Sequence, residues 1–98
     1  MIVFLEERTL VVKGYKARFA KAGETLIRMQ TDELEDWASL GNTSDLSSVE
    51  AFIIGECDTP ESQVARIRRI SEAPIIVLID NRNLEQIVRY FGCGADDV

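Results

Sequence analysis

Short apolar runs alternate along the chain with longer stretches in which apolar residues recur every three or four positions. The short runs lie at residues 2–5, 25–29, 51–54 and 75–79 and predict strands. The longer stretches begin at about residues 8, 32, 60 and 84 and predict helices. Four strands that alternate with four helices predict a parallel sheet covered on both faces by helices.

Residue types at the expected helix starts support these boundaries. Asp32 with Glu35 three residues later resembles a capping box. Thr59 is a candidate cap before Pro60, which suits a first helical position, and Asn83 is a candidate cap for the last helix. The third helix carries three arginines that we expect to face water. They are Arg66, Arg68 and Arg69.

Composition limits the kinds of protein that this chain can be. At 98 residues it is expected to form a single domain, residues 1–98. No apolar run approaches the ~20 residues that cross a bilayer, and the start lacks a basic leader, so we expect a cytoplasmic protein without a membrane partner. The net charge of −6 argues against direct binding of nucleic acid by this domain, because phosphate binding requires a basic face.

Side-chain chemistry excludes several kinds of active site. The chain has no histidine, which removes Ser/His/Asp and Cys/His catalysis and the commonest zinc ligand. Its two cysteines, Cys57 and Cys93, are far apart and are expected to be reduced thiols. There is also no phosphate-binding glycine-rich loop, so the sequence does not predict an enzyme.

Three of the predicted strands end in acidic residues. Glu6 and Glu7 follow the first strand, Glu56 and Asp58 follow the third, and Asp80 follows the fourth. The carboxyl ends of parallel strands meet at one edge of a sheet, and carboxylate oxygens are suitable ligands for Mg²⁺. Loops are polar for other reasons as well, so the acids equally fit ordinary loops.

The order of these motifs resembles the receiver domains of bacterial response regulators over essentially the whole chain. The first run with its acidic pair resembles the first receiver strand. The run that ends at Glu56, with Pro60 behind it, resembles the third strand with its phospho-acceptor and following proline. The most specific match is residues 94–97, Gly-Ala-Asp-Asp, a sequence found before the fifth strand of many receivers that are joined to winged-helix DNA-binding domains.

A narrower resemblance is to the alphaproteobacterial flagellar transcriptional regulators of the FtcR/Rem type, in the OmpR-like winged-helix class. It is carried by segments spread along the chain: residues 1–3, 14–15, 50–57, 73–74, 84–85 and 94–98. This resemblance implies the regulatory domain of a transcription regulator that controls flagellar genes and is not itself an enzyme. DNA would be bound by a further domain that is not in this chain.

The resemblance implies a phosphorylation site, but the residues at that site differ from the family pattern. The acceptor position holds Glu56 (or Gly55 in an alternative register) instead of aspartate, and the acidic pair is Glu6 and Glu7 instead of two aspartates. Ile79 stands where a threonine or serine is expected and cannot hydrogen-bond a phosphoryl oxygen. We therefore expect regulation without aspartyl phosphorylation and no cofactor, with a weak Mg²⁺ site at Glu6, Glu7 and Glu56 as the alternative.

The resemblance also implies a flavodoxin-like fold with strand order 2-1-3-4-5, of which the fifth strand and last helix are expected to be truncated. Residues 75–79 would then form an exposed apolar edge strand, and such edges pair with other chains, so we expect a homodimer. Two alternatives remain. One is a small-molecule- or metal-binding α/β domain, and the other is an interaction module that docks through residues 84–91.

Overall fold

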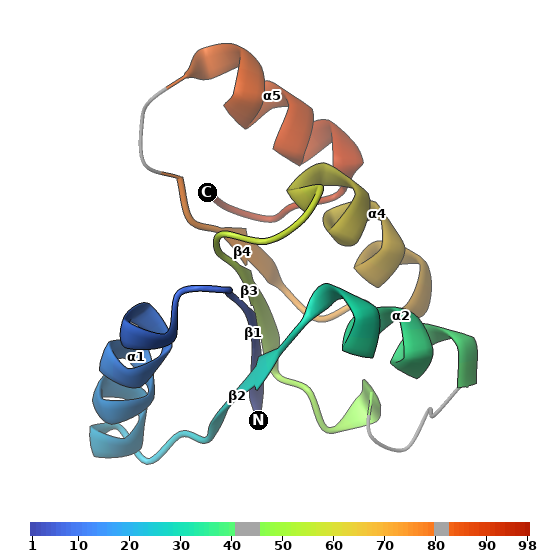
Figure 1. The fold of residues 1–98 in the computed structure, drawn as a ribbon. Helices are drawn as coiled ribbons and strands as arrows, with labels where there is room; N and C mark the ends of the chain where they lie inside the picture. The colour runs from blue at the N-terminus through green and yellow to red at the C-terminus, as the bar shows by residue number, and fades with distance from the viewer. Residues whose placement is uncertain (41–45, 80–82) are drawn as a thin grey trace.

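The computed structural model describes residues 1–40, 46–79 and 83–98, which form one parallel sheet flanked by helices. The four strands are β1 (Ile2–Leu5), β2 (Leu26–Met29), β3 (Ala51–Ile54) and β4 (Ile75–Val77). The four helices are α1 (Thr9–Lys21), α2 (Thr31–Leu40), α4 (Pro60–Ile70) and α5 (Leu84–Cys93). The strand order is β2-β1-β3-β4, as predicted for these four strands. Figure 1 shows α1 on one face of the sheet and α2, α4 and α5 on the other.

The two central strands carry the core because both of their faces are covered. All four residues of β1 are buried, and β3 lies beside it with Leu5 level with Ile54. Successive side chains of a strand point to opposite faces, so Phe4 packs toward α1 while Leu5 packs toward α2 and α4. On the α1 side, the ring of Tyr15 meets Phe4 edge-on at 5.1 Å between centroids. The polar residues that directly follow each apolar strand therefore lie together at one edge of a well-packed sheet.

The outer edge of β4 is partly covered, which corrects the expectation of a fully exposed apolar edge. The last residues of the chain run parallel to β4, and the backbone N–H of Val77 donates to the carbonyl of Asp97 at 3.0 Å. Ile75 and Val77 are both buried. The last residues of the chain thus lie beside β4, where the fifth strand of the predicted order 2-1-3-4-5 would begin.

Arg68 holds this segment in place, contrary to the expectation that it faces water. Its guanidinium donates to the carbonyl of Gly94 at 2.9 Å and to the carboxylate of Asp96 at 2.6 Å. Asp96 also accepts the backbone N–H of Ile75 at 2.8 Å. Gly94 has a φ of 116°, and an added Cβ would lie 2.9 Å from the Arg68 side chain, so glycine is required there. These contacts explain the first three residues of the Gly-Ala-Asp-Asp sequence, of which Ala95 is buried.

The helix starts were predicted with mixed success. The cap at Asn83 is confirmed, since its side chain accepts the backbone N–H of Gln86. Thr59 occupies the cap position of α4 with a φ of 44°, but its hydroxyl caps no backbone group and instead accepts from the side chain of Gln63. The capping box predicted at Asp32 and Glu35 is wrong by two residues, because α2 already begins at Thr31 and the side chain of Glu33 accepts the backbone N–H of Gln30 at 3.3 Å. Within the described ranges, no helix is both long enough and apolar enough to cross a membrane.

Candidate functional site

The acidic ends of β1 and β3 lie side by side, as the sequence predicted. Beyond the last paired strand residues, the backbone N–H of Gly55 donates to the carbonyl of Leu5 at 2.8 Å, and that of Glu7 donates to the carbonyl of Glu56 at 2.8 Å. The pairing of the two strands therefore continues past their formal ends. It brings the acidic pair and the predicted acceptor position to one small area at the carboxyl edge of the sheet.

Glu6 is the buried centre of this area, with only 1% of its surface exposed. Its Oε1 accepts the Nε–H of Arg8 at 2.7 Å and the backbone N–H of Arg8 at 3.1 Å. Its Oε2 accepts the Nη2–H of Arg8 at 3.2 Å and the backbone N–H of Glu56 at 2.9 Å. Both oxygens are thus fully engaged by donors of the chain itself, as a buried carboxylate requires.

Arg8 bridges the two strand ends. Besides its two-pronged contact with Glu6, its Nε lies 3.3 Å from the exposed carboxylate of Glu56. Burial raises the pKa of Glu6, but the hydrogen bonds and the positive charge of Arg8 and the backbone N–H of Glu56 outweigh burial and hold that pKa below its usual value. The result is a compact Glu6–Arg8–Glu56 network, in which one guanidinium pairs with two carboxylates that were predicted to attract an external cation and offsets one of their two negative charges.

Gly55 is required by the same network. The glycine is buried beside the carboxylate of Glu6, and an added Cβ would overlap Oε2 of Glu6 and lie 3.0 Å from the Phe4 ring. A residue without a side chain is therefore what allows the Glu6 carboxylate to sit under β3. This position contributes space rather than a functional group, which favours Glu56 over the alternative register at Gly55.

The described residues do not fit a divalent metal. No group of three carboxylate, cysteine or histidine side chains among them is arranged to hold an ion. Mg²⁺ needs several oxygen ligands in octahedral geometry, while the oxygens of Glu6 are engaged by Arg8 and the backbone. Glu7 is exposed, and Asp80 lies outside the described residues. The weak metal site at Glu6, Glu7 and Glu56 thus stays a prediction that this donor arrangement does not favour.

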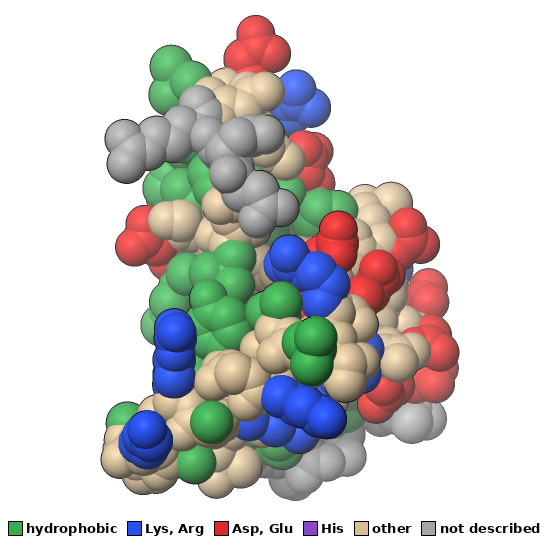
Figure 2. Space-filling view, turned by 60° about the vertical axis from the view of Figure 1, so that its left-hand side comes forward, with side chains coloured by type: hydrophobic (Ala, Val, Ile, Leu, Met, Phe, Trp, Pro, Cys, Tyr) green, Lys and Arg blue, Asp and Glu red, His purple; other side chains and the backbone are tan. Residues whose placement is uncertain are grey.

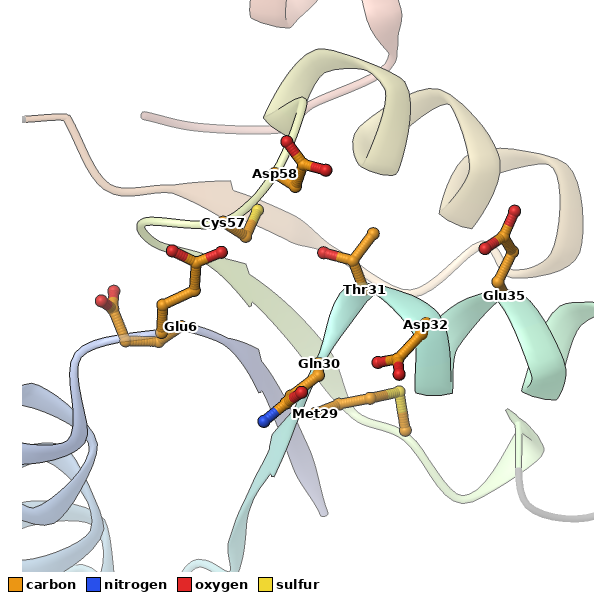
Figure 3. Close-up of a pocket in the computed structure, with 9 residues that line it drawn as sticks. Glu6, Met29, Gln30, Thr31, Asp32, Glu35, Cys57 and Asp58 are labelled. Carbon is orange, nitrogen blue, oxygen red and sulfur yellow. The ribbon is translucent and has the colours of Figure 1, made fainter.

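A pocket of about 310 Å³ opens next to this network, between the end of β1, the start of α2 and the loop after β3 (Figure 3). Its acidic lining consists of Glu6, Glu7, Asp32, Glu35 and Asp58. Cys57 also lines it, and burial together with the nearby charges of Glu7, Glu6 and Asp58 raises the pKa of this thiol to about 11. The thiol is therefore protonated at neutral pH and is a poor nucleophile. Both cysteines are free, as predicted.

Ile79 lies on the other side of the network. It lines a smaller pocket of about 180 Å³ together with Arg8, Gly55 and Glu56, and Tyr90 of α5 closes the far side. Tyr90 is 3% exposed and its hydroxyl accepts from the side chain of Gln86 at 3.3 Å. The apolar side chain of Ile79 thus stands level with the presumed acceptor and offers no hydroxyl there.

Two arginines at this edge were missed by the sequence reasoning. Arg8 completes the network described above, and Arg28 on β2 donates to the carbonyls of Glu6 at 2.9 Å and Glu7 at 2.8 Å. The sequence does hold a signal for Arg8, since it follows directly after two glutamates. The sequence holds no signal for the contacts of Arg28, because an arginine inside an apolar run indicates only an edge strand.

Solved structures with the same fold define the class. The chain superposes on the orphan response regulator HP1043 of H. pylori with a TM-score of 0.76 and 23% identity, which covers 98% of this chain and 77% of that one. It also superposes on TadZ, a CheY-like protein of Pseudomonas aeruginosa, with a TM-score of 0.72 and 14% identity, covering 98% and 82%. The fold is thus that of response-regulator receiver domains. No family model matches the chain.

Sequence relatives point to a particular group within that class. The chain is 35% identical over all of its 98 residues to the flagellar transcriptional regulator FtcR of Brucella abortus. The same identity is found with FtcR of Brucella suis and of Brucella melitensis. The chain spans 43% of the length of each of these relatives. The predicted resemblance to flagellar transcriptional regulators is therefore confirmed along the entire chain.

The tight fit between Gly55 and Glu6 generates a test of the site. We expect Gly55→Ala to lower the free energy of unfolding by about 1–3 kcal/mol, because the new methyl group displaces the Glu6 carboxylate from its donors. Urea unfolding measures this change. The matched control is Gly14→Ala in α1, where an added Cβ meets nothing within 4 Å and where alanine should stabilise the helix by about 0.5–1 kcal/mol. Equal stability of Gly55→Ala and wild type would contradict the assignment.

Proposed function

We propose that this chain is the receiver-like regulatory domain of a cytoplasmic transcription regulator that controls flagellar genes and works without aspartyl phosphorylation. DNA would be bound by another domain of the same protein. The similarity to FtcR over all 98 residues of this chain supports the regulator and its flagellar role, since that is how these relatives are named. The role of the domain is regulatory rather than enzymatic.

The observation that carries the proposal is the position of Arg8. In a receiver that is phosphorylated, an open carboxylate and a divalent cation must both be available at the carboxyl edge. Here the guanidinium of Arg8 lies between Glu6 and Glu56, at 2.7 and 3.3 Å from their oxygens. The chain thereby supplies its own cation to its acidic edge. The charge balance at this edge is fixed by folding and does not depend on a transferred phosphoryl group.

Two further residues, Glu56 and Ile79, also disfavour phosphotransfer. Glu56 carries its carboxylate one methylene farther out than aspartate does, and in-line transfer loses about a hundredfold for a misplacement of about 1 Å. Ile79 cannot donate to a phosphoryl oxygen. The domain would therefore keep one conformation, in which the exposed charge of Glu56 takes over part of the role of a phosphoryl group.

Incubation with acetyl phosphate and Mg²⁺ tests this proposal, with intact-protein mass spectrometry as the readout. We expect wild type to gain no stable phosphoryl group, while Glu56→Asp combined with Ile79→Thr and Arg8→Met gains a detectable fraction, because the acceptor is then an aspartate and the guanidinium no longer occupies the edge. The matched control is Asp58→Asn combined with Ile79→Thr and Arg8→Met, which alters an acid of the same loop that is not the acceptor and should gain no phosphoryl group. A stable phosphorylated species in wild type would overturn the proposal.

We also propose that the domain forms a homodimer through α5. This helix exposes an apolar stripe, in which Leu84 is 73% exposed, Val88 61% and Phe91 46%, while Tyr90 alone is buried. These three residues recur at the spacing of one helical face. Glu85 and Arg89 lie beside the stripe and pair with each other at 3.9 Å, so the exposed apolar residues, not unpaired charges, would form the contact with a second copy of α5. The stripe also suits the alternative of a docking face for another protein.

Sedimentation analysis of the Val88→Glu variant separates these two uses. In about 0.5 M salt, which screens contacts between exposed charges, we expect the variant to stay monomeric at concentrations where wild type is dimeric, because a charge replaces the centre of the stripe. The control Arg69→Glu changes an exposed residue of α4 that is not part of the stripe, and this variant should dimerise like wild type. A wild type that remains monomeric at every concentration would rule out the homodimer.

A further inference from the structure

Helix α1 carries a concentration of positive charge that the site described above does not use. Its thirteen residues include four basic side chains and no acidic one, in a chain of net charge −6. The basic residues are Lys13, Lys16, Arg18 and Lys21, and all four are exposed. All three lysines of the chain are therefore on this helix.

These basic side chains have no ion-pair partner among the described residues of their own molecule. Among the residues that the structure describes, none of the four forms an ion pair, whereas arginines 8, 66, 68 and 89 all do. In Figure 2, basic side chains lie mostly over the lower half of the molecule and acidic ones mostly along the right-hand side, although both kinds also appear near the top. A like-charged helix without internal partners is a surface that attracts an oppositely charged one.

The chain itself offers a surface of opposite charge on α2. This helix carries four acidic side chains and no basic one: Asp32, Glu33, Glu35 and Asp36, all of them exposed. Only Glu35 has an ion-pair partner among the described residues, Arg66 at 3.5 Å. The two helices lie on opposite faces of the sheet, so the charges of α1 cannot reach those of α2 within one molecule (Figure 1).

We propose that α1 of one copy of this chain binds α2 of another copy through these opposite charges. The two helices carry equal and opposite charge, since α1 has four basic side chains and α2 has four acidic ones. They are also similar in length, because ten to thirteen residues span about 15–20 Å. The contact is heterologous: each bound copy still has one free α1 or α2, so association continues by addition of further copies. It differs from the proposed pairing of α5, which joins identical surfaces.

The lysine distribution allows a direct test by zero-length cross-linking. A carbodiimide joins a lysine amine to a carboxylate in contact with it, and every lysine is on α1, so each lysine cross-link reports what α1 touches. Mixing ¹⁴N- and ¹⁵N-labelled copies identifies cross-links between different molecules by mass spectrometry. We expect interchain links from α1 to the acids of α2, which disappear at about 0.5 M salt because the charges are screened.

A charge exchange provides the matched variants. In the Val88→Glu background, which removes the proposed α5 contact, Lys13→Glu with Lys21→Glu, and separately Glu33→Lys with Asp36→Lys, should each reduce self-association about tenfold or more, since like charges then oppose each other. A mixture of the two variants should associate again, through the reversed helices. Glu72→Lys, a single charge change outside α2, should leave association unchanged.

Two results would overturn the proposal. One is a set of interchain cross-links from α1 that go to carboxylates other than those of α2, or no such links at all. The other is failure of the mixed variants to associate while each remains folded by circular dichroism. Binding of wild type to duplex DNA that is lost in Lys13→Glu with Lys21→Glu, without interchain links to α2, would assign the basic helix to nucleic acid instead.

Discussion

The contact between Arg8 and Glu6 is the interaction on which the functional edge of this domain depends. A buried carboxylate is costly unless it is paired and hydrogen-bonded, and Glu6 meets this requirement with the guanidinium and two backbone N–H groups. Because one of these donors belongs to Glu56, the same carboxylate fastens the end of β1 to the loop after β3. Gly55 leaves the space for this contact, and the exposed side chain of Glu56 is then held at the mouth of the site.

The fold was predictable from sequence because its signals are local and repeated. Apolar runs of buried strands alternate with helical periodicity, and that order by itself specifies a parallel sheet, which the structure confirms as β2-β1-β3-β4. The acidic residues that directly follow these apolar runs predicted which side chains lie at the carboxyl edge of the sheet. Glu6, Glu7 and Glu56 do meet there, and Ile79 lies beside them.

What sequence could not supply is the partner of each charge. Arg68 was expected to face water and Arg8 was not singled out, yet Arg8 pairs with the carboxylates of the acidic edge and Arg68 fixes the last residues of the chain. An arginine can reach several neighbours from one backbone position, so its contacts follow from tertiary geometry rather than from spacing. The negative total charge also drew attention away from α1, whose charged side chains are all basic. The exposed stripe on α5 likewise has the periodicity of a core-facing helix.

The pKa of the Glu6 carboxyl group tests the central claim, that Arg8 is the built-in cation of this edge. Because the folded-state pKa lies below the usual 4.5, ionised Glu6 stabilises the fold at neutral pH, and this contribution is lost as the pH falls through that pKa. Carboxyl-carbon NMR titration of wild type and Arg8→Met should show the pKa rise in the variant, since burial remains after the guanidinium is gone. Arg28→Met, which loses bonds only to backbone carbonyls, should leave the pKa of Glu6 unchanged. An equally low pKa of Glu6 in Arg8→Met would contradict the account.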